Sequence, residues 1–157
     1  MKKNLIILFL MITFPIKAFA LIEVDITRGN LNPLPLAVSP LSIDDKSKTS
    51  FEKILKKENI GSEISIIVEN NLRTSGLFNP ISKDAFLQAP DIANLKPRFE
   101  DWNLIKAQAL ITGKVTYVDE KLRVEFRLWD ILAAKEMMAL AFTTVPSNWR
   151  RVGHIIS

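Results

Sequence analysis

The sequence predicts an α+β domain: a mixed or antiparallel sheet of about five strands with a C-terminal three-strand meander, and helices packed on one face. Two observations favour this class. Three strand-like segments follow one another near the C-terminus, joined by links short enough for hairpins (119–121 and 131–136). A regular apolar stripe of helical period covers 62–75.

The first twenty residues have the pattern of a secretory signal peptide. Two lysines precede a ten-residue apolar run, 5–14, and Ala18 and Ala20 occupy the small-residue positions that signal peptidase recognises. A bilayer span needs about 20 apolar residues, which is roughly twice this run. We therefore expect cleavage after Ala20, export to the periplasm and no membrane span after cleavage. A retained N-terminal anchor is the alternative.

The charge balance changes when this leader is set aside. The chain has 21 Lys and Arg against 17 Asp and Glu, but three of the lysines and none of the acids lie in 1–20. The remaining 137 residues carry a net charge of +1 (18 against 17), so the overall basic character is not a nucleic-acid footprint. The absence of cysteine excludes disulfides and thiolate chemistry.

The clearest helix is expected at 62–75, with Ser62 as its N-cap and Gly76 just after its end in a positive-φ conformation. The other segments expected before the meander are a buried strand at 36–40, a lysine-rich loop or short amphipathic helix at 44–57, an extended piece at 77–81, a loop at 89–98 and a helix at 99–106. In the last of these, Trp102 is expected to be a core anchor, with Phe99, Ile105 and Leu104 also facing inward.

The meander is expected at 109–118, 122–130 and 137–145. Leu122, Val124, Phe126 and Leu128 alternate with charged residues in its second strand, which predicts one buried and one solvated face. In the third strand, 138, 140 and 142 are the apolar positions. A last helix, capped by Ser147, is expected to bury Trp149, Val152, Ile155 and Ile156.

Residues that could carry chemistry are scarce. His154 is the only histidine and is expected on a helix surface, and the five glycines are isolated, so no phosphate-binding loop is present. The adjacent acidic pairs at 100–101 and 119–120 are typical of helix starts and turns. We therefore expect no enzyme, no catalytic residue, no cofactor and no metal site.

A short alternating segment just after the expected cleavage site is the candidate for binding. It comprises Glu23, Val24, Asp25, Ile26, Thr27 and Arg28. Such a strand at a new N-terminus can join the edge of a sheet in another protein, with backbone hydrogen bonds for affinity and Val24 and Ile26 for register. An ordinary first strand or a disordered tail remains the alternative.

Several stretches resemble the TolB family of the Tol-Pal system. They are EVDITRGNLNPLPLAVSP, NNLRTSGLFNPIS, DWNLIKAQALITGKV, LRVEFRLWD and SNWRRVGHIIS, in the order found in that family. The resemblance implies a periplasmic protein with an α/β N-terminal domain followed by a six-bladed β-propeller. It also implies that 21–32 binds the C-terminal domain of TolA and that the propeller binds the lipoprotein Pal. The family's system draws the outer membrane inward at division, maintains its integrity and is exploited in colicin import.

The expected organisation is a signal peptide at 1–20, a partner-binding segment at 21–33 and a TolB N-terminal-like domain at 34–157. A chain that ends at Ser157 would be truncated before the propeller, so we expect TolA binding to survive and Pal binding to be lost. The alternatives are a small envelope assembly domain of the lipoprotein-activator type and a nonfunctional remnant. No nucleic-acid partner is expected.

Overall fold

The computed structural model describes residues 32–91 and 96–157. The expected signal peptide, with Ala18 and Ala20, and the expected binding strand 23–28 lie outside these ranges. Residues 31–157 form one compact unit. Within the described residues, no helix is both long enough and apolar enough to cross a bilayer.

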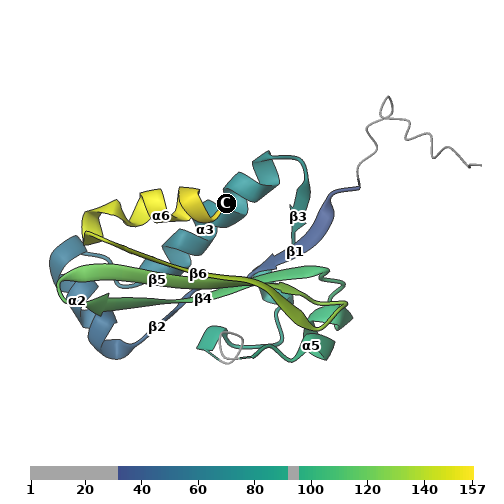
Figure 1. The fold of residues 1–157 in the computed structure, drawn as a ribbon, viewed down its shortest axis with the longest axis horizontal. Coiled ribbons are helices and arrows are strands. Elements are labelled where there is room, and N and C mark those ends of the chain that lie inside the picture. The colour runs from purple at the N-terminus through teal and green to yellow at the C-terminus, as the bar shows by residue number, and fades with distance from the viewer. Residues whose placement is uncertain (1–31, 92–95) are drawn as a thin grey trace, which may run out of the picture. The chain divides into compact units, whose positions relative to one another are not determined.

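A six-stranded mixed sheet forms the centre of this unit (Figure 1). The strands are β1 (Leu34–Val38), β2 (Ser42–Ile43), β3 (Phe78–Pro80), β4 (Ala109–Val118), β5 (Lys121–Asp130) and β6 (Lys135–Thr144). Their spatial order is β3-β1-β4-β5-β6, with β2 also paired to β4. The α+β class and the mixed sheet are thus confirmed, while the short strand β2 was not expected.

The C-terminal meander is confirmed, with β4, β5 and β6 paired antiparallel in succession. Asp119 and Glu120 both have positive φ (49° and 59°), as a two-residue hairpin turn of type I′ requires. β1 lies between β3 and β4 and runs parallel to both. These parallel pairings are long-range, because the helical segments that follow β1 separate it from β3 and β4 in the sequence.

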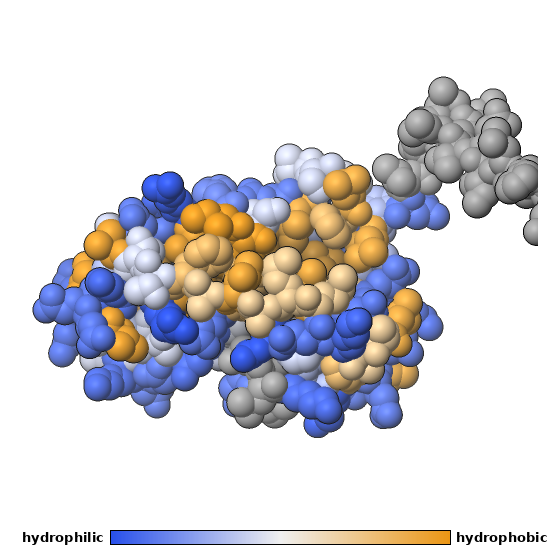
Figure 2. Space-filling view, in the orientation of Figure 1, coloured by the Kyte–Doolittle hydropathy of each residue, from blue (hydrophilic) through white to orange (hydrophobic). Residues whose placement is uncertain are grey.

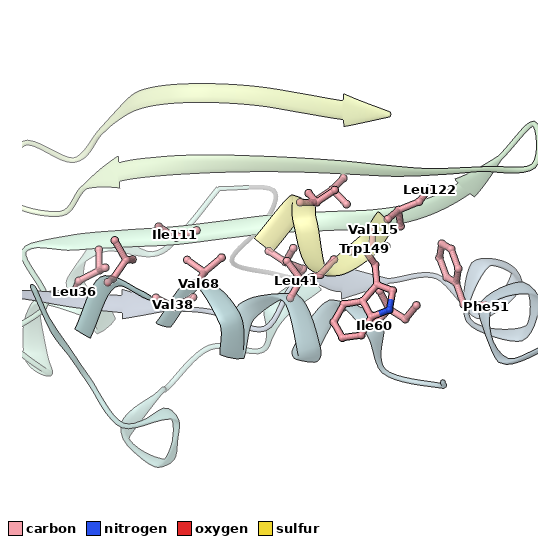
Figure 3. Close-up of a cluster of buried hydrophobic side chains, with 14 residues drawn as sticks. Leu36, Val38, Leu41, Phe51, Ile60, Val68, Ile111, Val115, Leu122 and Trp149 are labelled. Carbon is pink, nitrogen blue, oxygen red and sulfur yellow. The ribbon is translucent and has the colours of Figure 1, made fainter. Parts of the chain in front are cut away.

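The main core lies between the sheet and the helices α2 (Asp45–Leu55), α3 (Ile60–Thr74) and α6 (Trp149–Ile156), whose side chains meet those of the strands (Figure 3). Its buried members are Leu36, Val38, Leu41, Phe51, Ile60, Ile64, Val68, Leu72, Ile111, Val115, Leu122, Val124, Trp149 and Val152. Ile64, Val68 and Leu72 form the expected helical stripe. Burying each such side chain contributes about 1.5–3 kcal/mol.

A second, smaller core lies on the opposite face of the sheet. It joins Ala37, Leu110 and Trp129 to Trp102 of the short helix α5 (Phe99–Leu104), which Figure 1 shows on that side. Trp102 is only 1% exposed, so its expected role as an anchor is confirmed. Leu104 was expected to face inward, but it is 70% exposed because it lies on the outer side of this short helix.

Helix α2 resolves the lysine-rich segment, which is a helix of 11 residues rather than a loop. Asp44 caps it by accepting a hydrogen bond from the backbone N–H of Ser47 (2.9 Å). Phe51 is fully buried, whereas Ile54 is 49% exposed. The lysines of α2 are exposed or half-buried, so they lie on the face turned away from Phe51 and the core.

Two expected helix caps are wrong. Helix α3 begins at Ile60, so Ser62 lies inside its first turn instead of capping it. Ser147 lies within the 3-10 turn η2 (Pro146–Asn148), and α6 begins two residues later. In both places an apolar residue that the core buries, Ile60 or Trp149, starts the helix, because burial outweighs the capping preference. Gly76 has the expected positive φ, +74°.

Candidate partner-binding surface

An apolar groove of about 610 Å³ opens on the face of the sheet that carries α3 and α6. Residues from β1, β3, β4, β5, β6 and both helices line it: Leu34, Leu36, Leu72, Phe78, Gln108, Ala109, Ile111, Phe126, Leu128, Asp130, Leu132, Met137, Met138, Leu140, Ile155, Ile156 and Ser157. Figure 2 shows hydrophobic surface gathered over this region of the molecule.

The groove exists because the helices cover only part of the sheet. Helices α2 and α3 contact β1, β2, β3 and β4, and α6 lies beside the end of β6, where Phe142 lines a small pocket with Val152 and Ile155. Met138 and Leu140 therefore remain 46% and 48% exposed, although they point to the same face as the buried side chains of β5. These two apolar positions of the third predicted strand face the core side, but nothing in the described chain covers them fully.

The chemistry of the groove favours an apolar partner. Among its lining residues, Asp130 is the single ionisable side chain, and its carboxylate accepts a hydrogen bond from the backbone N–H of Ala133 (2.8 Å). The lining includes no lysine, arginine or histidine. A ligand would therefore gain mainly from burial of hydrophobic area.

Apart from Trp129, which belongs to the second core, the opposite face of β5 is polar, as the alternating pattern predicted. Arg123 pairs with Glu125 (2.7 Å) and Arg127 with Glu136 of β6 (3.2 Å). All four side chains are partly exposed, so these pairs contribute little to stability. They mark this part of the sheet as a solvated face rather than a docking surface.

His154 lies on the exposed side of α6, as expected. Its Nδ1 atom is 2.8 Å from the side-chain amide nitrogen of Asn71 on α3, which also donates to the hydroxyl of Ser157 (2.7 Å). These contacts join the C-terminal ends of the two helices. Among the described residues, no group of three metal-ligating side chains is close enough to hold an ion.

The predicted binding residues Glu23, Val24, Asp25, Ile26, Thr27 and Arg28 lie outside the described ranges, so their role remains a prediction. The groove was not predicted from the sequence. The nine uncharged residues at 137–145 were a signal that could have indicated it, because a strand at the edge of a sheet seldom lacks charge. Identifying that strand as the edge required the strand order.

The fold and the groove together define the class of protein: a small α+β domain with an apolar groove on one face of its sheet. The sequence profile of the TolB amino-terminal domain matches residues 22–137. The chain therefore belongs to the TolB family. It is 84% identical over 155 residues to the Tol-Pal system protein TolB of Pelagibacter ubique (strain HTCC1062). That match covers 99% of this chain but 34% of the relative, so the chain spans about a third of the relative's length.

Solved structures show the same fold. TolB from Acinetobacter baumannii superimposes with a TM-score of 0.58 at 20% identity, over 80% of this chain and 26% of that chain. The C-terminal domain of LpoB from Escherichia coli gives 0.52 at 11% identity, over 74% of this chain and 86% of that domain. At these identities the likeness concerns the fold alone. The resemblance to TolB drawn from the sequence is confirmed by the family match.

Proposed function

We propose that this protein is a periplasmic, non-enzymatic component of the Tol-Pal system that binds the C-terminal domain of TolA through residues 23–28. The observation that carries the proposal is the 84% identity, over nearly the whole chain, to a Tol-Pal system protein. The signal-peptide pattern of 1–20 supports export to the periplasm. The family resemblance supports TolA as the partner.

The mechanism proposed is addition of a strand to the TolA sheet. Val24 and Ile26 would project to one face and Asp25 and Thr27 to the other, since side chains alternate along a strand. Backbone hydrogen bonds would supply affinity, and the two apolar side chains would set the register. Gly29, Asn30, Asn32 and Pro33 separate this segment from β1 in the sequence.

The sharpest test compares the two faces of that strand. Calorimetric titration of the TolA C-terminal domain into the exported chain should give measurable binding. Val24→Asp with Ile26→Asp should weaken it at least about tenfold, which corresponds to about 1.4 kcal/mol. The matched control, Asp25→Ser with Thr27→Ser, alters the other face and should change affinity by less than about threefold.

Deletion of 21–32 should abolish TolA binding. Unchanged affinity of the deletion variant would contradict the proposal, as would equal losses in the two face variants. A 157-residue polypeptide is expected to give no signal with Pal, because the family resemblance assigns Pal to the propeller. The structural likeness to LpoB, at 11% identity, does not favour the activator alternative.

In cells, the proposed role is to support outer-membrane invagination at division and outer-membrane integrity, with exploitation by colicins. Expression in a strain lacking its own TolB tests what this chain supplies on its own. Partial restoration of detergent resistance that depends on 21–32 would support TolA binding in the envelope.

A further inference from the structure

Strand β6 is an open edge of the sheet. It is the last strand in the spatial order and pairs with β5 along its length, from Lys135 to Thr144. In the described part of the chain, no strand pairs with its other side. The opposite edge, β3, is only three residues long and ends in Pro80, which has no backbone N–H to donate.

The edge of β6 lacks the features that normally protect such strands. Natural edges carry charged side chains, prolines or bulges that prevent pairing with another chain. In β6 the charged residues Lys135 and Glu136 stand at the start, beside a single register shift, and Glu136 is held by Arg127 (3.2 Å). Residues 137–145 contain neither charge nor proline. In the described part of the chain, β5 is the strand that pairs with this stretch, and its outer side carries no charge or proline that would oppose a further strand.

We propose that a second copy of this chain pairs with β6 in antiparallel orientation, with the two-fold axis at Leu140. In this register Leu140 faces Leu140 of the other copy, and Met138 faces Phe142. Directly opposed residues of antiparallel strands lie on the same face, so these apolar side chains would form one row on the groove side. Ala139 and Ala141 would face each other on the other side.

A second copy of the chain fits this edge in both symmetry and charge. A residue on the two-fold axis lies opposite the same residue of the other copy. A charged side chain at that position would therefore be repelled by the identical charge of its partner. Leu140 lies within a run of nine uncharged residues, 137–145, so no like-charge pair arises between them in this register. Met138 and Leu140, about half exposed, also line the groove, so pairing would join the two grooves into one apolar surface.

The size of the contact sets the expected strength. A stable interface uses about 20–30 residues and about 800 Å² on each side, whereas β6 supplies ten residues. The dimer should therefore be weak and concentration-dependent, with a dissociation constant in the micromolar range or above. This inference goes beyond TolA binding and uses no residue of 21–32.

Sedimentation velocity of the exported chain between about 1 and 500 µM tests the proposal, since this range brackets weak interfaces. The sedimentation coefficient should rise with concentration toward that of a dimer. Leu140→Lys should weaken association at least tenfold. The matched control is Leu104→Lys, the same substitution at a 70% exposed leucine of α5 on the other face, and it should have no effect.

Mixing two variants tests the register itself. Leu140→Lys and Leu140→Glu should each be monomeric alone, and their equimolar mixture should associate, because residue 140 meets residue 140 only when the axis passes through it. Circular dichroism melts of each variant establish that it is folded. A chain that stays monomeric at 500 µM, or a Leu140→Lys variant that associates like the unsubstituted chain, would overturn the proposal. Failure of the mixture to associate would overturn the register and with it the dimer proposed.

Discussion

Ser47 joins helix α2 to strand β4 through one hydroxyl group. Its Oγ donates to the carboxylate of Asp44 (2.9 Å) and accepts the backbone N–H of Tyr117 (2.8 Å). The backbone N–H of Ser47, its hydroxyl and the charge of Lys114 hold the pKa of Asp44 below its usual range, although partial burial opposes them. A single cap therefore fixes both the start of α2 and its position on the sheet.

This cap predicts an acid-dependent stability. Because the folded-state pKa of Asp44 is lowered, its contribution is fully present above the unfolded value of about 3.8 and is lost as pH falls through the lower folded value. Asp44→Ala should lower the free energy of unfolding by about 1 kcal/mol at pH 7. The deficit should shrink at pH 2.5, as measured by urea denaturation.

The companion variants separate the charge from the hydrogen bond. Asp44→Asn, which can still accept the Ser47 N–H, should retain most of the stability at pH 7 and flatten the acid limb. Asp45→Ala removes the neighbouring carboxylate and should cost less. An Asp44→Ala deficit that is equally large at both pH values would contradict the role assigned to the Asp44 carboxylate.

At the scale of elements, α3 and α6 pack closely because one residue of α6 has no side chain. A Cβ atom built on Gly153 would lie 2.9 Å from Cγ2 and 3.0 Å from Cβ of Ile67 on α3. Ile67 Cβ is attached directly to the backbone and cannot rotate away. The approach of the two helices therefore depends on glycine at this position, and α6 in turn covers the core with Trp149 and Val152.

Gly153→Ala tests this contact. Alanine favours helix by about 1 kcal/mol, but overpacking costs about 1–3 kcal/mol, so we expect a net loss of about 1 kcal/mol in unfolding free energy. In an Ile67→Ala background the loss should become smaller or change sign, because Cγ2 is absent. Urea denaturation of the four proteins of this cycle gives the coupling. Equal effects of Gly153→Ala in both backgrounds would show that Ile67 is not the obstacle.

At the scale of the whole molecule, residues 31–157 form one compact unit with cores on both faces of its sheet. The proposed TolA-binding segment precedes this unit in the sequence. The domain and the binding strand can therefore be tested separately, which distinguishes a folded adaptor from a nonfunctional remnant.

We expect the exported chain to unfold in a single cooperative thermal transition monitored by circular dichroism. Deletion of 21–32 should move the midpoint by less than about 2 °C, because β1 begins at Leu34 and the described core uses no residue before it. Deletion of residues 34–38, which removes β1 from the centre of the sheet, is the contrasting control and should abolish the transition. A non-cooperative melt of the intact chain would favour the remnant.

The sequence by itself determined the elements whose signals are local. The alternation in 122–128 predicted β5 and its polar face, and the stripe ending at Leu72, followed by Gly76, predicted the end of α3. Family membership could also be predicted from the sequence, because several stretches resemble stretches of the TolB family and occur in the same order. The helix caps were predicted less well. Ser62 is a residue type that N-cap positions favour, but α3 begins two residues earlier, at the buried Ile60.

Only the tertiary structure decided how these elements combine. The parallel pairing of β1 with β3 and β4, the second core around Trp102, and the groove between Leu34 and Met138 all join residues far apart in the chain. Periodicity reports which side of an element is apolar but not which neighbour covers it. That β6 is an edge, with Leu140 half exposed rather than buried, follows from the strand order, because exposure depends on what packs alongside and not on the residue itself.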